Sequence, residues 1–403
     1  MRTKTSKRTL NTEEKYLSKK FKGSIMVVWM LVGFFVGVII VSSIYSQSHE
    51  GVIQLTFIYS SEKASWIGET QAEFEVYWAE KMEANASLKP IRLNFQPYGS
   101  GSSLIALLNG EIKPTIWSPA SNLWIPLLNT KWHEITNSEV PIVTSFERFI
   151  YSPVVLTVWE DFQAEHNIKG LNDLHDLIQA NPGLVKLAHT DPRTSNSGFM
   201  ATIMMVVSNL GLSPEDITLD AISQQELIDW MRTVESAAVQ YGESTGFLGR
   251  YMRDNGPGAL NAVFLYENLV QDYSSRAAEN FGQRMIAIYP EEGALFSDHP
   301  FCLIDADWVT PEQRMAAEEY IRFMNRKEII MKAIGTGFRP IDTSLLEMPD
   351  VFEIYNQSFR EEFGVTSDPG IIRELLPPTD GVVISRVPDL WLMTRATSTR
   401  QMG

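Results

Sequence analysis

The chain has 403 residues, of which 44% are apolar and 21% are charged, a composition typical of globular rather than disordered proteins. Its formal net charge of −15 is unevenly distributed: residues 1–23 carry eight Lys or Arg against two Glu, so this head is +6 and the rest is −21. Such an acidic body repels nucleic-acid backbones and anionic lipid headgroups, so neither nucleic acid nor a second membrane surface is an expected partner.

An uncharged apolar segment, Ser24–Ile44, follows the basic head. As a helix it reaches ~31 Å, which is enough to cross the hydrocarbon core of a bilayer. Basic residues precede this segment, whereas Tyr45–Val52 has no Lys or Arg, so the positive-inside rule puts the head in the cytoplasm. We predict a cytoplasmic head at 1–23 and a transmembrane signal anchor at 24–45, with the body outside the cell membrane. The alternative is a cleaved signal peptide, whose apolar region is usually shorter, about 7–15 residues.

Strand-like and helix-like segments alternate from residue 52 onward, which predicts an α/β body. The first strand, Val52–Tyr59, is β-branched and aromatic and precedes a helix at Ser65–Ala84. Further strands are expected at Ile91–Gln96, Pro114–Trp117, Val154–Trp159, Val185–Ala188, Leu260–Tyr266 and Arg284–Tyr289. Further helices are expected at Ser102–Asn109, Leu171–Gln179, Phe199–Leu210 and Pro311–Ile334.

Three loops rich in serine follow strands of the first half: Ser60-Ser61, Gly99–Ser103 and Ser118–Ser121. In open α/β sheets, ligands bind at the carboxyl ends of strands. The Gly99–Ser103 loop also begins a helix, whose free N–H groups favour polar or anionic ligand groups. The alternative for that loop is an ordinary turn with a good helix cap.

The second half repeats this chemistry in Asp191–Gly198, where polar residues lead into an apolar helix. Tyr266 and Glu267 end another apolar strand. Glu267 is expected either to accept hydrogen bonds from a ligand or to pair with a neighbouring arginine, and its charge argues against a fully ionised oxyanion ligand.

No long Gly/Ser linker separates the halves, so short crossings near Ser152–Trp159 and Pro300–Ala306 should join two lobes. We predict a discontinuous first lobe at 51–153 and 305–403, and a second lobe with hinge strands at 154–304.

The order of the motifs resembles that of the extracellular solute-binding proteins of type II topology, nearest to the branch of molybdate and sulfate receptors. The segments that carry the resemblance are Gly99–Ser103, Trp117–Ser121, Thr194–Gly198, Tyr266-Glu267 and Gln313–Pro340. The resemblance covers residues 52–340. It implies a two-lobed α/β fold, periplasmic-binding-protein-like, that closes over a solute and presents it to an ABC permease. Carried over by position, it implies these ligand contacts: Ser60, Ser61, Ser102, Ser103, Ser118, Thr194, Ser195, Tyr266 and Glu267.

No cofactor, metal or catalytic residue is predicted, because the six histidines lack metal-ligand spacing and no Walker A or dinucleotide motif is present. The single cysteine, Cys302, excludes an intramolecular disulfide. Two other functions stay open: a non-transporting sensing or docking module on the same fold, and a serine hydrolase using His189 and Ser195, which lacks a nucleophile elbow. The solute itself, whether an oxyanion, a sugar or an amine-bearing compound, is also open.

Overall fold

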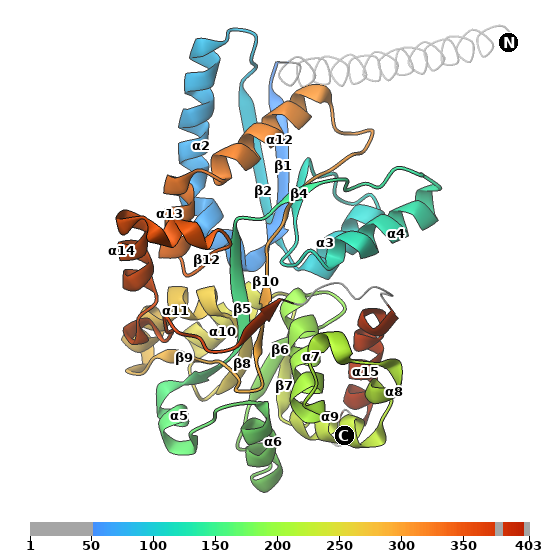
Figure 1. The fold of residues 1–403 in the computed structure, drawn as a ribbon, viewed down its shortest axis with the longest axis vertical. Helices are drawn as coiled ribbons and strands as arrows, with labels where there is room; N and C mark the ends of the chain where they lie inside the picture. The colour runs from blue at the N-terminus through green and yellow to red at the C-terminus, as the bar shows by residue number, and fades with distance from the viewer. Residues whose placement is uncertain (1–50, 375–381, 399–403) are drawn as a thin grey trace, which may run out of the picture. The chain divides into compact units, whose positions relative to one another are not determined.

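The computed structural model describes residues 51–374 and 382–398. The predicted head and transmembrane anchor, residues 1–45, lie outside the described residues. Gln54–Lys81 and Leu93–Gly403 form one compact unit, and the architecture below is that of this unit (Figure 1).

The first lobe is built on a five-stranded sheet with the order β2-β1-β3-β11-β4. Strands β1 and β3 are parallel, whereas β11 is antiparallel to both β3 and β4. Its strands are β1 (Ile53–Ser60), β2 (Ile91–Tyr98), β3 (Ile116–Ser118), β4 (Phe146–Glu147) and β11 (Phe301–Leu303). Its helices are α2 (Ala64–Ala84), α3 (Ser100–Leu108), α4 (Trp124–Thr136), α12 (Pro311–Met324) and α13 (Lys327–Gly335).

Helix α2 packs one aromatic face onto this lobe. Its buried residues Trp66, Phe74 and Trp78 recur at helical spacing. Phe74 lies edge-on to Tyr320 of α12, with ring centroids 4.9 Å apart. The ring centroid of Tyr320 lies 5.4 Å from that of Phe57 in β1. These aromatic contacts join β1, α2 and α12 into a core that fixes the start of α2, where the candidate site begins.

The second lobe contains an eight-stranded sheet with the path β13-β10-β5-β8-β6-β7, and both β9 and β12 pair with β5. Its strands are β5 (Ile150–Trp159), β6 (Leu187–Thr190), β7 (Ala238–Gly242), β8 (Ala262–Tyr266), β9 (Met285–Ile288), β10 (Ala294–Ser297), β12 (Arg339–Pro340) and β13 (Ile372–Glu374). Its helices are α5 (Glu160–His166), α6 (Leu171–Ala180), α7 (Asn196–Leu210), α8 (Leu219–Ile222), α9 (Gln225–Glu235), α10 (Thr245–Asn255) and α11 (Glu267–Phe281).

Short segments connect the lobes, among them the steps from β4 to β5, from β10 to β11 and from α13 to β12. Strand β5 begins beside β12, which follows α13, and continues as the partner of β8 and β9. The chain returns where β10 of the second sheet ends at Ser297 and β11 of the first begins at Phe301. His299 lies on this return and has a left-handed φ of 45°, a conformation uncommon outside glycine. Two lobes, each with a β-sheet and helices, agree with the predicted α/β fold.

Two parts of the chain differ from the prediction. The helix expected at Pro311–Ile334 is two helices, α12 and α13, because Arg326 is extended with φ −71° and ψ 143°. The C-terminal segment, assigned to the first lobe, contacts both lobes: α14 (Pro349–Ser358) packs on α13, whereas β13 pairs with β10 and α15 (Val382–Ser398) packs on α7, α8 and α9. Figure 1 shows α15 beside α8. The division into lobes otherwise stays a prediction.

Candidate functional site

Lys63 is fully buried where the first-lobe loops meet. Its Nζ donates to the carbonyl and the hydroxyl of Ser118, at 2.9 and 2.7 Å, and to the carbonyl of Pro119 at 3.1 Å. Burial lowers the pKa of Lys63 to about 7, although the Glu62 carboxylate opposes this shift. The three bonds account for all three protons of an ammonium group, so Lys63 holds the loop after β3 against the start of α2.

Glu62 and His299 form a second buried contact at this position. Ser60 donates its hydroxyl to Glu62 Oε1, and His299 Nδ1 lies 3.1 Å from the same oxygen. Burial opposes ionisation of Glu62, but His299, Lys63 and Ser60 outweigh it and lower the pKa of Glu62. Burial also lowers the pKa of His299 to about 4, so its imidazole is neutral at pH 7.

The contact between His299 and Glu62 lacks hydrogen-bond geometry. His299 Nδ1 has only this contact with Glu62, Nε2 has no hydrogen-bond partner among the residues that the structure describes, and the side chain is 0% exposed. Its ring instead packs edge-on against Tyr266 and Phe338, with centroids 5.6 and 5.1 Å apart. Buried polar groups without a partner are rare in native proteins and each one needs an explanation.

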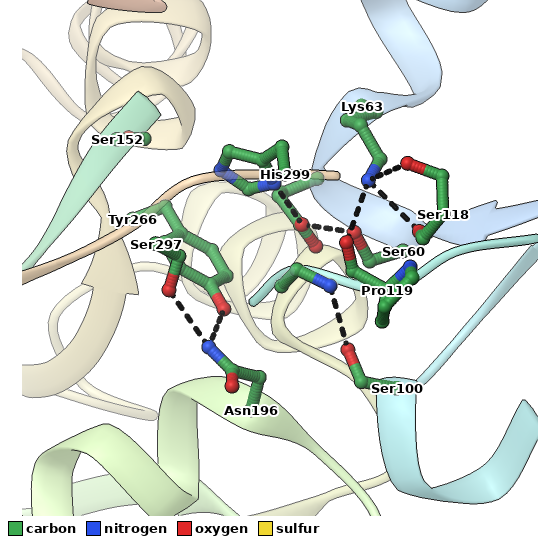
Figure 2. Close-up of polar contacts among 12 residues, drawn as sticks. Ser60, Lys63, Ser100, Ser118, Pro119, Ser152, Asn196, Tyr266, Ser297 and His299 are labelled. Atoms are coloured by element: carbon green, nitrogen blue, oxygen red, sulfur yellow. Dashed lines mark hydrogen bonds and ion pairs between the residues drawn. The ribbon is translucent and has the colours of Figure 1, made fainter. Parts of the chain in front are cut away.

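The second lobe supplies Asn196, the first residue of α7. Its Nδ2 donates to the Tyr266 hydroxyl at 2.9 Å and to Ser297 Oγ at 2.8 Å, while its Oδ1 accepts from Trp124 Nε1 of the first lobe at 2.8 Å. Burial raises the pKa of Tyr266 well above its usual value, so its phenol stays protonated. Figure 2 shows Tyr266, Ser297 and Asn196 facing Ser60, Ser100 and Pro119.

Glycines let the two lobes approach closely around this cluster. The Ser102 N–H donates to the Thr194 carbonyl at 3.0 Å, and a Cβ on Gly101 would lie 2.4 Å from the Arg193 carbonyl. On the other side, the Gly246 N–H donates to Ser61 Oγ at 3.2 Å. Since Cβ atoms do not tolerate a 2.4 Å contact, this approach requires glycine at position 101.

Residues 55–339 match the family model of the bacterial extracellular solute-binding proteins. The chain belongs to that family. No curated protein matches the sequence. Among solved structures, the chain is similar to the sulfate-binding protein SubI from Mycobacterium tuberculosis H37Rv, with 14% identity, a TM-score of 0.53, and 83% of this chain and 99% of the other covered.

Two further structures of solute-binding proteins share the fold. The PBP MotA from A. tumefaciens B6 in complex with glucopine has 13% identity and a TM-score of 0.57, covering 85% of this chain and 99% of its own. A periplasmic thiamin binding protein has 13% identity and a TM-score of 0.55, covering 85% and 96%. The predicted two-lobed, periplasmic-binding-protein-like α/β fold is thereby confirmed. At these identities the likeness concerns the fold alone.

The structure brings most of the predicted contact residues of this solute-binding protein to the junction between the lobes. Ser60, Ser61, Ser118 and Tyr266 are buried there, and Ser102 meets Thr194. Ser195 is buried at the start of α7. Ser103 differs, because its hydroxyl donates to the Ser100 carbonyl and accepts from Trp117 Nε1, both within the first lobe.

Glu267 pairs with an arginine, as one of its two sequence interpretations expected. Arg339 donates to both of its oxygens at 2.7 Å, and Tyr289 donates to it as well. Arg339 also donates to the Thr366 carbonyl of the C-terminal segment at 2.7 Å. The pair therefore joins α11, β12 and the segment beyond it.

Sequence reasoning missed five residues of the junction: Glu62, Lys63, Asn196, Ser297 and His299. Glu62 and Lys63 directly follow Ser60-Ser61, and Asn196 directly follows Ser195, so these three stood beside residues already singled out. His299 carried no signal, because it lies in no metal-ligand spacing and in no catalytic motif.

A hollow of about 460 Å³ lies elsewhere in the first lobe, lined by residues that include Phe146, Phe149, Phe301 and Arg322. None of the nine predicted ligand contacts lines it. In the part of the chain that the structure describes, no group of three His, Cys, Asp or Glu residues is arranged to hold a metal ion. Among these same residues, no helix has both the length and the apolar character needed to cross a membrane.

Proposed function

We propose that this protein captures a small polar solute between its two lobes and presents it to a transporter, in the manner of a receptor for an ABC permease. One observation carries the proposal: polar side chains from both lobes and from their connection are buried together, and one of their polar atoms, His299 Nε2, has no hydrogen-bond partner among the described residues. A few convergent polar groups in a buried site are typical of ligand-binding proteins. A solute would supply the missing hydrogen bonds.

The capture mechanism follows from linkage between binding and closure. A solute that contacts Ser118 of the first lobe and Tyr266 of the second stabilises the closed form by its differential affinity for that form. The close approach at Gly101 allows the lobes to meet around it. A transporter that recognises the closed form then distinguishes loaded from empty receptor without any chemical step.

We further propose that residues 24–45 anchor the body to the outer side of the cell membrane, with the basic head in the cytoplasm. The uncharged Ser24–Ile44 segment and the positive charge before it support this part. Mass spectrometry of protein purified from the membrane fraction should detect the peptides of the head. A mature chain that begins beyond residue 45 would contradict the anchor and leave solute capture unaffected.

The branch related to molybdate and sulfate receptors stays our proposed placement, on the strength of the serine-rich loops. Solute capture is tested by a thermal-shift screen of small polar compounds on the full chain in detergent. At least one compound should raise the melting temperature, and Ser118→Ala and Tyr266→Phe should each reduce the shift. Absence of any shift across oxyanions, sugars and amines would contradict capture.

A second candidate function is a non-transporting sensing or docking module. It is favoured by the C-terminal segment, which packs on α13 through α14 and on α7 and α9 through α15 and so ties the lobes together. Affinity purification from detergent-solubilised membranes separates the two functions. Recovery of permease subunits supports the receptor, whereas recovery of a different envelope complex without a permease supports the docking module.

A further inference from the structure

Three hydroxyl groups at the lobe junction have their oxygens held by protein N–H groups. Ser100 Oγ accepts from the Ala120 N–H at 3.0 Å, Ser118 Oγ accepts from Lys63, and Tyr266 accepts from Asn196. Neither serine hydroxyl donates a hydrogen bond to another described residue, whereas the Tyr266 hydroxyl also interacts with the Ser297 side chain. Because a hydroxyl is both acceptor and donor, Ser100 and Ser118 each retain a proton that a ligand oxygen or nitrogen can accept.

Acceptor groups stand beside these donors. Glu62 Oε1 lies 3.1 Å from His299 Nδ1, and a carboxylate at this distance favours the tautomer with the proton on Nδ1. The other nitrogen of the neutral ring then carries a lone pair. It has no partner among the described residues, so a ligand N–H or O–H group can donate to it.

Each carboxylate at the junction has a basic neighbour. Lys63, whose pKa burial lowers to about 7, only partly offsets the charge of Glu62, and Asp298, which is buried next to His299, lies 3.2 Å from the Arg148 guanidinium. Lys63 has its protons committed to three protein oxygens, so it offers no N–H group to a ligand. Burying a net charge without a direct partner costs far more than burying a neutral polar group.

We infer that the solute is a small neutral compound whose hydroxyl or amide groups both donate and accept hydrogen bonds, rather than a fully ionised oxyanion. The inference rests on the proposed function, because it assigns the ligand class of the same junction. A sulfate or molybdate ion would be unable to donate to His299 and would lie beside the Glu62 carboxylate. A polyol, a sugar or a small amide satisfies both sets of groups.

Isothermal titration calorimetry on the full chain in detergent tests the ligand class with two sets of probes. The neutral set contains myo-inositol, D-ribose, glycerol and acetamide, and the ionised set contains sulfate and molybdate. We expect a neutral probe to bind and the ionised ones to bind at least about tenfold more weakly. Glu62→Gln removes the negative charge and should narrow that difference by strengthening sulfate binding about tenfold.

Tyr266→Phe tests whether binding occurs at the junction, because it removes one polar group there without changing the ring. It should weaken the neutral probe about three- to tenfold. Tyr320→Phe is the matched control, since Tyr320 is equally buried in the first-lobe core and its hydroxyl has no partner among the described residues. The Tyr320→Phe variant should bind the neutral probe with the same affinity as the unaltered chain.

The outcomes separate this inference from the proposed function. Tighter binding of sulfate or molybdate than of every neutral probe would overturn the ligand class and keep solute capture. If a neutral probe binds with an affinity that neither Glu62→Gln nor Tyr266→Phe changes, the assignment of the site to the junction is overturned. If no probe of either set binds, solute capture itself fails and the ligand class fails with it.

Discussion

Two buried histidine–glutamate pairs occur among the described residues, and they differ in how completely their hydrogen bonds are satisfied. In the second lobe, His189 lies 2.9 Å from Glu235, its other nitrogen lies 2.8 Å from the Thr190 carbonyl, and Tyr241 donates to the same carboxylate at 2.7 Å. At the junction, His299 approaches Glu62 without a hydrogen bond. All four side chains are almost fully buried.

The pKa directions follow this difference. Burial opposes protonation of His189, but Glu235 and the Thr190 carbonyl outweigh it and raise its pKa above 6.5, and each ring nitrogen faces an acceptor oxygen. Burial prevails at His299 and lowers its pKa to about 4. A buried pair that is fully hydrogen-bonded is explained by the fold alone, whereas an incomplete one between two lobes offers a free polar atom to a ligand.

The largest expected effect is on the complete pair. His189→Asn should lower the free energy of unfolding by about 3–5 kcal/mol, because it leaves Glu235 buried without its cation. Urea denaturation at pH 6 measures this loss in the free energy of unfolding. A loss below about 1 kcal/mol would show that the pair contributes little to stability.

A smaller effect is expected from separating the lobes at Gly101. Gly101→Ala places a Cβ 2.4 Å from the Arg193 carbonyl, and such overpacking costs about 1–3 kcal/mol. As the junction loosens, the pKa of His299 should rise from about 4 toward 6.5 in an NMR titration, while that of His189 stays raised.

Gly68→Ala is the control for this experiment, because a Cβ there meets nothing within 4 Å and the residue lies in α2. It should leave both histidine titrations unchanged. If Gly101→Ala also leaves the titration of His299 unchanged, the contact with the Arg193 loop is not what buries that ring.

The next effect is a dependence of stability on pH. Since the folded pKa of His189 is raised above 6.5, its contribution is complete below pH 6.5 and is lost as pH rises through the folded value. The unfolding free-energy difference between the unaltered chain and His189→Asn should therefore shrink above pH 6.5, by at most about 1.4 kcal/mol per pH unit. A difference that grows with pH would mean that the pair is neutral.

The sequence predicted those features of the fold and the junction that depend on local patterns, and not those that depend on long-range packing. The alternation of strands and helices predicted the α/β lobes, and serines after strands predicted the surroundings of the junction, because turn chemistry and periodicity are local. The break between α12 and α13 was missed because no Gly or Pro marks Asn325 or Arg326. The placement of α15 depends on long-range packing, which no local pattern encodes.

The polar centre of the junction was predictable only in part for the same reason. Lys63 and Glu62 belong to residue types that are seldom buried, so their position follows from the bonds to Ser118 and Ser60, which come together only in the folded chain. Neither His189 nor His299 sits in a motif. Sequence alone therefore gave no means of distinguishing the satisfied histidine from the unsatisfied one.

The smallest expected effect on stability is at the incomplete pair. His299→Asn should lower the free energy of unfolding by only about 1 kcal/mol, because ring contacts with Tyr266 and Phe338 are lost but no hydrogen bond to the described chain is, and Asn tolerates the left-handed backbone at this position. The same substitution should weaken solute binding about tenfold. His189→Asn and His299→Asn make the same chemical change at two sites. For each site, the ratio of stability loss to affinity loss therefore shows whether the pair serves the fold or the ligand. A stability loss at His299 as large as that at His189 would mean that both pairs serve the fold, and the incomplete pair would no longer support a ligand site at the junction.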